Sequence, residues 1–448
     1  MSEKRSSFTG KIGFVLAAAG SAVGLGNIWR FPYLAAKYGG GVFLLTYILL
    51  ALTFGFALMC AEIAIGRKTG KSAIGAFRDL DKRFGFVGVL ASVVPMIILP
   101  YYSVIGGWVT KYIVVFVSGQ GTAAADSSYF GDFIGQPAEP LVYFLIFMGV
   151  TALIVLFGVE KGIEKVSKFM MPLLVVMILG ITVYVLCQPG IWPGVKDYLL
   201  PDFSEFSINT VLGAMGQLFY SMSLAMGIMI TYGSYMKKDS HIESSVHQIE
   251  LFDTGIAVLA GLMIVPVATA FGDGVNAPGP GLMFSTLPTV FDKMPGGHVV
   301  GAVFFILVLF AALTSSISLM ETVVSIFCDK FGWNRKWTCL VVFIGCIVLG
   351  VPSSLGNGIW ADFKIIGMDF LTFCDFITNS VMMPIVALLT CLFVGFVIKP
   401  VSIVEEIEQT GKFKLKKLFT VVIKWLAPIC IVLILISSVL DGLGIFKI

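Results

Sequence analysis

The chain has 448 residues, of which 57% are hydrophobic and 13% are charged, and its mean hydropathy is +0.95. Because a soluble domain carries about 25% charged residues, this composition excludes an ordinary water-soluble protein. The net charge is +3, and the basic residues form no stripe suited to nucleic acid. The three histidines are too scattered along the chain to predict a metal site.

A membrane-spanning helix needs roughly 20 mostly apolar residues. Eleven stretches meet this requirement, at about 11–36, 41–65, 84–118, 141–158, 166–187, 209–236, 247–272, 296–328, 337–352, 367–398 and 418–440. The predicted fold class is therefore an all-α integral membrane protein with 11 transmembrane helices, formed by residues 1–448 as a single domain. The N-terminal tail leads into the first span without a small-residue cleavage site, so we interpret it as retained and not as a signal peptide.

The lysines and arginines orient these spans, because cytoplasmic loops hold the excess of both residues. Most of the 30 basic residues fall in the N-terminal tail and in the loops after even-numbered spans. The opposite side holds only Lys37, Lys196, Lys293, Lys364 and Lys447. This asymmetry predicts a multi-pass protein of the cell (inner) membrane with a cytoplasmic N-terminus and an extracellular or periplasmic C-terminus.

The first span contains a stretch that cannot form a regular helix easily. It runs Gly20-Ser-Ala-Val-Gly24-Leu-Gly26-Asn27-Ile-Trp-Arg30-Phe-Pro32. Glycines and a proline weaken a helix. Gly20 and Gly24 could instead form a helix-packing face, but packing requires neither Asn27 nor Arg30. We expect a broken helix here.

The first cytoplasmic loop, from Gly66 to Ser72, resembles a phosphate-binding loop but has one residue too few between its glycines. It also follows a membrane helix and not a strand, so we do not interpret it as a nucleotide site.

The sixth span repeats the pattern of the first, with polar groups and glycines between Gly216 and Gly227. Two interrupted spans at matching positions point to the binding site of a transporter built from inverted repeats. Carbonyls freed at a helix break can coordinate Na⁺, and helix N-termini can bind a carboxylate. Span eight adds hydroxyls at Thr314, Ser315 and Ser316, although such a run can also bond its own backbone.

Charged residues inside spans are rare and mark function by default. This chain places Arg30, Glu62, Asp253, Glu321, Asp369 and Asp375 within predicted spans. Asp253 and Glu62 lie too deep to reach water by extending along the helix.

Three motifs together resemble the neurotransmitter:sodium symporter (NSS) family, the sodium- and chloride-dependent transporters, and especially its bacterial leucine, tyrosine and multi-hydrophobic amino-acid members. They are Gly24-Leu-Gly-Asn27-x-Trp-Arg30-Phe-Pro-Tyr33, Gly216-Gln217-x-Phe-Tyr-Ser221 and Leu313-Thr-Ser-Ser316. The resemblance runs from about Arg5 to the end of the chain. It implies the inverted five-plus-five repeat of the leucine-transporter fold, with repeats at 11–187 and 209–398, broken helices 1 and 6, and an additional span at 418–440.

The resemblance also implies two sodium sites, with Na⁺ as the coupling ion. The first site would use Ala22, Asn27, Ser221 and Asp253, together with the carboxylate of the substrate. The second would use Gly20, Val23, Ala311, Thr314 and Ser315.

The resemblance further implies a place for an amino-acid substrate. Its backbone would lie against Ser21, Ala22, Gly24, Leu25 and Gly26, with Tyr102 bonding the carboxylate and Tyr220 closing over it. Ser221 would lie beside both the ion and the substrate. The side chain would meet Ile98, Ser223, Met226, Ser316 and Leu319.

Four charged residues resemble the gates of this family. Arg30 and Asp369 are expected to pair outside the site, and Arg5 and Asp329 inside it, with Phe8 where relatives often have tryptophan. Without the resemblance, all four would be ordinary interfacial charges. Gly162 and Pro172 match the family's fifth-span motif for inward opening.

Three residues depart from the family pattern in ways that bear on the substrate and the ion. Gly24 replaces an aspartate of the amine transporters and leaves room for a carboxylate, and Met226 gives an adaptable wall suited to a large hydrophobic or aromatic side chain. Asp253 replaces a usual asparagine, and its fixed charge could substitute for the bound anion of chloride-dependent relatives. We therefore expect chloride-independent uptake.

The predicted function is sodium-coupled amino-acid uptake by alternating access in a lipid bilayer, by a monomer or weak dimer. A receptor on the same fold would need a signalling domain, and a channel would need a continuous polar pore. No nucleophile and base pair suggests an enzyme, and no feature suggests nucleic-acid binding.

Overall fold

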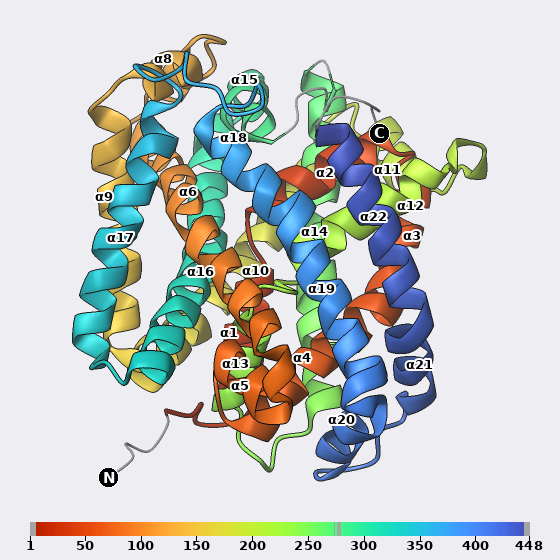
Figure 1. Cartoon of the computed structure of the whole chain (residues 1–448). Coiled ribbons are helices and arrows are strands. Elements are labelled where there is room, and N and C mark those ends of the chain that lie inside the picture. Colours follow the sequence, from red (N-terminus) through yellow and green to blue (C-terminus); the bar gives the residue numbers. More distant parts are fainter. Residues whose placement is uncertain (1–5, 273, 276–278, 443–448) are drawn as a thin grey trace.

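The computed structural model describes residues 6–272, 274–275 and 279–442. Within these ranges the chain is helical, and its only β contacts are isolated bridges at Gly40–Pro201 and Ile365–Met368. The long helices stand roughly side by side, and shorter helices cover the two ends (Figure 1). The chain enters α1 near the lower face of this view and leaves α22 near the upper face.

Nine helical stretches of the described chain are long and apolar enough to cross a membrane. The stretches are Gly41–Thr69, Lys82–Val117, Glu139–Leu156, Val159–Leu186, Ile242–Phe271, Gly297–Phe331, Arg335–Leu355, Phe370–Val397 and Lys416–Leu440. The helices that form them are, in chain order, α3 (Gly41–Leu50), α4 (Phe56–Thr69), α6 (Gly85–Val117), α9 (Glu139–Leu156), α10 (Lys165–Leu186), α14 (Ile242–Phe271), α16 (Gly297–Phe331), α17 (Arg335–Leu355), α18 (Phe370–Asp375), α19 (Met383–Leu392), α21 (Lys416–Val421) and α22 (Ala427–Gly442).

Two further spans are interrupted. Lys11–Ala22 (α1) and Gly26–Lys37, which ends in α2 (Phe31–Lys37), pass the length and hydropathy test together and are bent by 53°. The predicted sixth span consists of α12 (Ile208–Ser221) and α13 (Ile228–Tyr235), each too short to cross alone. The two breaks that we predicted are therefore present in the fold.

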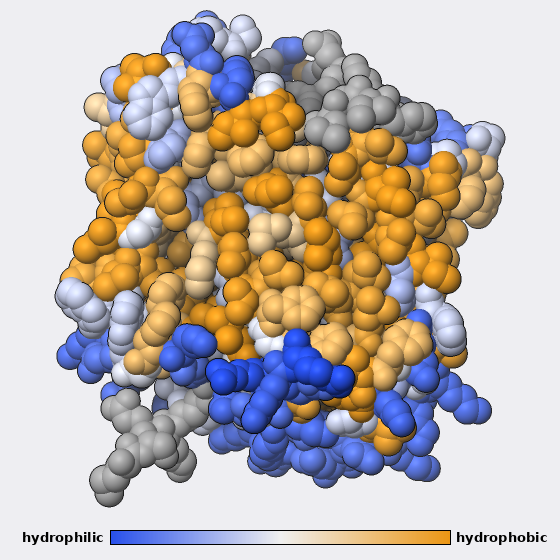
Figure 2. Space-filling view, in the orientation of Figure 1, coloured by the Kyte–Doolittle hydropathy of each residue, from blue (hydrophilic) through white to orange (hydrophobic). Residues whose placement is uncertain are grey.

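Short helices cover the ends of the spans. They are α5 (Ala73–Leu80), α7 (Gly121–Ala124), α8 (Tyr129–Gly135), α11 (Trp192–Leu199), α15 (Leu287–Lys293) and α20 (Lys399–Glu408). A broad apolar belt lies between the two hydrophilic ends in Figure 2. Exposed residues such as Val176, Leu153 and Ile344 fit contact with lipid tails, because large apolar side chains are otherwise rarely so exposed in groups.

The interrupted helices lie at the centre of the molecule. The helix α1 packs against α10, α14 and α16, and α13 packs against α4. The α4–α13 contact is close because of glycine: a Cβ on Gly66 would overlap the carbonyl of Ile230, and one on Gly233 would overlap the backbone of Ile63. Small residues allow such close backbone approach in membrane helices.

A buried charge cluster joins α13, α16 and α17 near the start of α17. The Glu321 side chain is fully buried and pairs with Arg335, whose Nη2 contacts Glu321 and also donates to the carbonyl of Val155 at 2.7 Å. The hydroxyl of Tyr235 also donates to Glu321, at 2.7 Å. The cluster therefore fixes the start of α17 against α9, α13 and α16.

Replacing Arg335 with alanine is expected to lower the free energy of unfolding by about 3 kcal/mol, because it leaves the buried charge of Glu321 without its cation. Thermal unfolding of the purified protein in detergent measures this effect. Lys336→Ala is the matched control, since Lys336 is the next residue and is exposed. Equal unfolding temperatures for the two variants would contradict the structural role of the cluster.

Candidate functional site

The break in the first span exposes backbone groups in the middle of the molecule. Helix α1 ends at Ala22, and Val23 adopts an extended conformation, with φ −72° and ψ 101°. The side-chain oxygen of Asn27 accepts a hydrogen bond from the N–H of Gly24 at 3.0 Å, which stabilises the turn. The carbonyls before the break lose their helical partners and remain available to other donors or to a cation.

The break in the sixth span is more strained. Ser223, Ala225 and Gly227 all have positive φ values, of 52°, 61° and 72°. Such conformations are costly for residues other than glycine and persist only where the surroundings hold them. The buried carboxylate of Glu62 provides one such support, because it accepts the N–H of Ala225 at 2.8 Å.

The two breaks meet at a buried carboxylate. Asp253 on α14 is fully buried, and its Oδ1 accepts from the amide of Asn27 and from the hydroxyl of Ser221, both at 2.7 Å. Its Oδ2 accepts from the hydroxyl of Tyr47 at 3.2 Å. Nearby, the amide of Gln217 donates to the carbonyl of Gly26 at 3.0 Å. Three of the four residues predicted for the first sodium site thus touch one another in a cluster rich in oxygen ligands.

A second group of oxygens lies between α1 and α16. The hydroxyl of Ser315 is within 3.5 Å of the Gly20 carbonyl, 3.1 Å of the Ser21 carbonyl and 3.3 Å of the Val23 carbonyl. One hydroxyl hydrogen cannot serve three carbonyls, so this cluster has spare acceptors that suit a cation. Thr314 lies against Gly20 and bonds the carbonyl of Ala311 at 3.1 Å.

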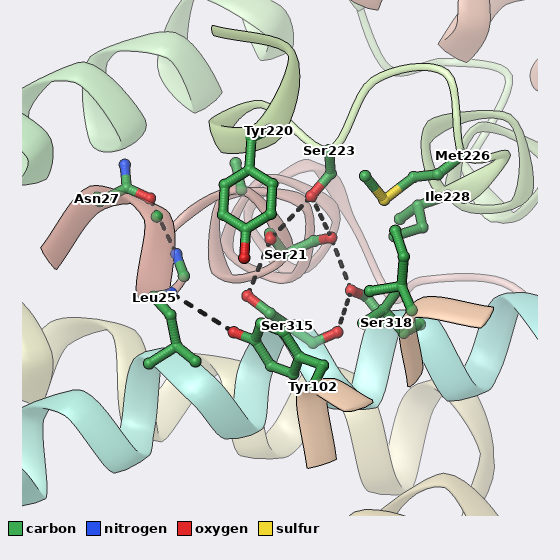
Figure 3. A pocket seen from close by; sticks show the side chains of 15 residues that line it. Ser21, Leu25, Asn27, Tyr102, Tyr220, Ser223, Met226, Ile228, Ser315 and Ser318 are labelled. Carbon is green, nitrogen blue, oxygen red and sulfur yellow. Dashed lines mark hydrogen bonds between the residues drawn. The ribbon is translucent and has the colours of Figure 1, made fainter. Parts of the chain in front are cut away.

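A small pocket opens beside both clusters. Figure 3 shows it between the two breaks, α6 and α16. Eleven predicted substrate residues line it: Ser21, Ala22, Gly24, Leu25, Gly26, Ile98, Tyr102, Tyr220, Ser223, Met226 and Leu319. Its lining also includes Asn27, Ser315, Ile228 and Ser318, and the last two were not predicted at all.

Two predicted substrate residues do not line this pocket. The hydroxyl of Ser316 lies 3.0 Å from that of Thr151 on α9, and Ser221 faces Asn27 and Asp253. The predicted contact between Ser316 and the substrate side chain is therefore not supported by the geometry. The reason is the helical period, which turns Ser316 about 100° away from Ser315.

One end of the pocket offers hydrogen-bond donors. The N–H of Leu25 lies 3.5 Å from the hydroxyl oxygen of Tyr102. This separation is long for a hydrogen bond, so both groups can donate to a ligand atom that lies beside them. The site can thus hold an anionic group beside the helix break, close to Gly24.

The outer charges are arranged differently from the prediction. Asp369 does not pair with Arg30: it caps α18, where its carboxylate accepts the N–H of Thr372 at 3.0 Å. A second carboxylate in the same stretch, Asp375, accepts from the hydroxyl of Tyr101 at 3.2 Å and from the amide of Asn379 at 2.6 Å. The structure therefore does not show the predicted pair between Arg30 and Asp369, and Asp375 is the alternative candidate for the outer partner of Arg30.

The guanidinium of Arg30 lies 5.4 Å from the ring centre of Tyr220, which lines the pocket. Arg30 thus lies over a residue of the pocket wall.

Only one residue of the predicted inner pair lies within the described part of the chain. Arg5 lies outside the described residues, and the carboxylate of Asp329 accepts the N–H of Ser72 at 2.8 Å. Phe8 is fully buried and packs edge-on against Phe14 and Tyr232, with ring centres 5.7 Å and 5.6 Å apart.

The segment between Gly162 and Pro172 holds the N-terminal segment in place. Its buried Glu164 accepts the N–H of Thr9 at 2.8 Å and pairs with Lys168 at 2.6 Å. A change in the conformation of this segment would therefore release the tail that precedes α1.

Comparison with known proteins identifies the fold and the family. The model of the sodium:neurotransmitter symporter family matches residues 5–123 and 130–443. The sodium-dependent transporter YhdH of Bacillus subtilis is 35% identical over 454 residues, covering 98% of this chain and 99% of that protein. A sodium-dependent transporter of Methanocaldococcus jannaschii is 33% identical, covering 92% and 86% of the two chains.

Among solved structures, the crystal structure of MhsT in complex with L-phenylalanine superposes with a TM-score of 0.88 at 37% identity. The match covers 97% of this chain and 100% of that one. It confirms the predicted all-α fold class. With the family model and the relatives, it leads to one conclusion: this chain belongs to the sodium:neurotransmitter symporter family of sodium-dependent membrane transporters.

Proposed function

We propose that this protein takes up a large hydrophobic or aromatic amino acid together with sodium, by alternating access and without chloride. One observation carries the proposal: the two broken helices meet at a pocket flanked by two oxygen-rich clusters, around Asp253 and around Ser315. A cation on either side of the pocket stabilises the breaks that also bind the substrate. Each ligand then raises the affinity of the other by the same factor.

The proposed first sodium site consists of Ala22, Asn27, Ser221, Asp253 and the substrate carboxylate. The proposed second site consists of the Gly20 and Val23 carbonyls with Ala311, Thr314 and Ser315. Both sets consist of oxygen ligands, which hard cations prefer. The negative charge of Asp253 supports ion binding without chloride, because an opposite charge at about 4 Å is worth about 4 kcal/mol at an effective dielectric near 20.

The substrate class is supported by the two ends of the pocket. Gly24, the N–H of Leu25 and the hydroxyl of Tyr102 offer room and donors to a carboxylate. Ile98, Met226 and Leu319 offer apolar contacts to a side chain. The similar protein MhsT was crystallised with L-phenylalanine, a ligand of this kind.

For alternating access, we propose that Arg30, Asp375 and Tyr220 close the outer side and that Asp329 belongs to the inner gate with Arg5. Loosening of the segment from Gly162 to Pro172 would release Thr9 from Glu164 and open the inner side. The interrupted spans support two inverted repeats, at 11–187 and 209–398. The basic loops support a cytoplasmic N-terminus in the cell (inner) membrane.

Replacing Asp375 with asparagine is expected to lower the initial rate of uptake by about tenfold, because Arg30 loses its facing charge while hydrogen bonding is kept. Asp369→Asn is the matched control, since Asp369 is six residues away and caps α18. Its uptake is expected to stay within about twofold of the wild type, as an asparagine caps a helix equally well. If Asp369→Asn instead lowers the rate of uptake more than Asp375→Asn does, Asp369 is the gate residue.

A competition screen tests the proposed substrate class. Each of the twenty amino acids is added to vesicles that contain the purified protein and a labelled hydrophobic amino acid, under an inward sodium gradient. Large hydrophobic and aromatic amino acids are expected to compete. Competition by charged or small polar amino acids alone would contradict the proposal.

A further inference from the structure

Three serines form a hydroxyl cluster in the lining of the pocket, and we call Ser21, Ser223 and Ser318 the serine cluster. Figure 3 shows their side chains pointing toward one another from α1, the sixth-span break and α16. The Ser21 hydroxyl lies 2.7 Å from that of Ser318 and 3.1 Å from that of Ser223. All three residues are buried, with exposed fractions of 5% or less.

The hydroxyl hydrogens of this cluster already form hydrogen bonds. Ser223 donates to the carbonyl of Ser21 at 2.9 Å, and Ser318 donates to the carbonyl of Ser315 at 2.8 Å. The single hydrogen of Ser21 serves one of the other two hydroxyls. Each hydroxyl oxygen also carries two lone pairs, so the cluster has more lone pairs than hydrogens that reach them. This holds even if Tyr232, which interacts with Ser318, adds one more hydrogen.

The serine cluster is therefore an acceptor-rich patch in an otherwise largely apolar wall. Ile98, Met226 and Leu319 line the same pocket. A side chain that fits both surfaces is apolar along its length and carries an O–H or N–H group. Among the natural amino acids, the large side chains of this kind are those of tyrosine and tryptophan.

We propose that the serine cluster makes this pocket selective for aromatic amino acids that carry a hydrogen-bond donor, above all tyrosine, over phenylalanine. The inference rests on the proposed amino-acid transport and assigns Ser318 as a specificity-determining residue. The serines satisfy one another when no donor is present, so an apolar side chain is still accepted. The expected preference is about fivefold, the value of one net hydrogen bond.

The α-ammonium of the substrate is also a donor and could use the same lone pairs. The two roles differ in their consequences. Every amino acid carries the ammonium, so a serine that binds it affects tyrosine and phenylalanine equally. A serine that binds the side-chain hydroxyl changes only the ratio between them.

The test measures the affinities of labelled tyrosine and labelled phenylalanine in vesicles containing the full-length protein, under an inward sodium gradient. The wild type is expected to bind tyrosine about fivefold more tightly, and Ser318→Ala is expected to remove this preference while leaving phenylalanine unchanged. Ser316→Ala is the matched control: it lies on the same helix, its hydroxyl meets Thr151, and it should keep the wild-type ratio. Ser318→Cys provides a second variant of similar size, with a weaker acceptor and the same expected direction.

A wild-type ratio near one, or an equal loss for both amino acids in the Ser318 variants, would overturn this inference while leaving amino-acid transport intact. Absence of sodium-driven uptake of any amino acid would overturn the proposed function and this inference together. The two failures are therefore distinguishable in the same vesicles.

Discussion

Replacing Asp253 with asparagine is expected to reduce sodium-driven uptake in chloride-free medium by about 100-fold, and added chloride is expected to restore part of it. The carboxylate is fully buried and accepts hydrogen bonds from Asn27, Ser221 and Tyr47. Asparagine keeps the shape but removes the negative charge that attracts the cation. A mobile anion can then supply the missing charge beside the same hydroxyls.

The measurement compares initial uptake rates in sodium chloride and in sodium gluconate. Glu250→Gln is the matched control, because Glu250 is another buried acid on α14 but bonds His247, at 3.2 Å, and not the cluster around Asn27. This control should remain indifferent to chloride. Normal, chloride-indifferent uptake by Asp253→Asn would refute the proposed role of the carboxylate.

Replacing Gly24 with alanine is expected to weaken substrate affinity by about 10- to 100-fold, because the added methyl group would overlap the atoms that line the pocket. A Cβ at this position would lie 2.8 Å from the hydroxyl oxygen of Ser315 and 3.3 Å from that of Tyr102. The methyl group would occupy the space proposed for the substrate carboxylate. It would also press on Ser315, which belongs to the proposed second sodium site.

The apparent affinities for the amino acid and for sodium are both measured, together with the unfolding temperature. Gly149→Ala on α9 is the matched control, because a Cβ there meets no atom within 4 Å. It should leave all three quantities unchanged. Unchanged substrate affinity in Gly24→Ala would mean that the carboxylate lies elsewhere.

The sequence predicted the centre of the site well because the residues that form the site are unfavourable in an ordinary membrane helix. Glycines followed by Asn27 and Arg30 in a membrane span disfavour a continuous helix, and the structure breaks there. Asp253 was too deep to reach water, and the structure buries it completely. Most of the predicted substrate residues line one pocket for the same reason: they cluster at the two breaks.

The errors arose where local sequence could not fix the geometry. Asp369 and Asp375 both lie in the predicted tenth span, and the start of α18 at Phe370 makes the first of them a helix cap. The four-residue spacing of Asp375 and Asn379 indicated that Asp375 lies within the helix, since residues at this spacing share a helix face. Likewise, Ser318 is three residues after Ser315 and lies on its face, whereas Ser316 does not.

The stabilising contacts of the sixth-span break could not be predicted. The positive φ value of Ala225 is supported by Glu62, which is more than 160 residues away in the chain. No local propensity indicates such a contact. The same holds for the link between Thr9 and Glu164.

Uptake into vesicles that contain only the purified protein tests the central claim most directly. Labelled amino acid is supplied outside at a concentration below that inside, with an inward gradient of either sodium or potassium. Sodium-coupled transport by the two broken helices predicts uphill accumulation with sodium and none with potassium. Equal accumulation in both gradients would contradict the coupling that we propose for Asp253 and Ser315.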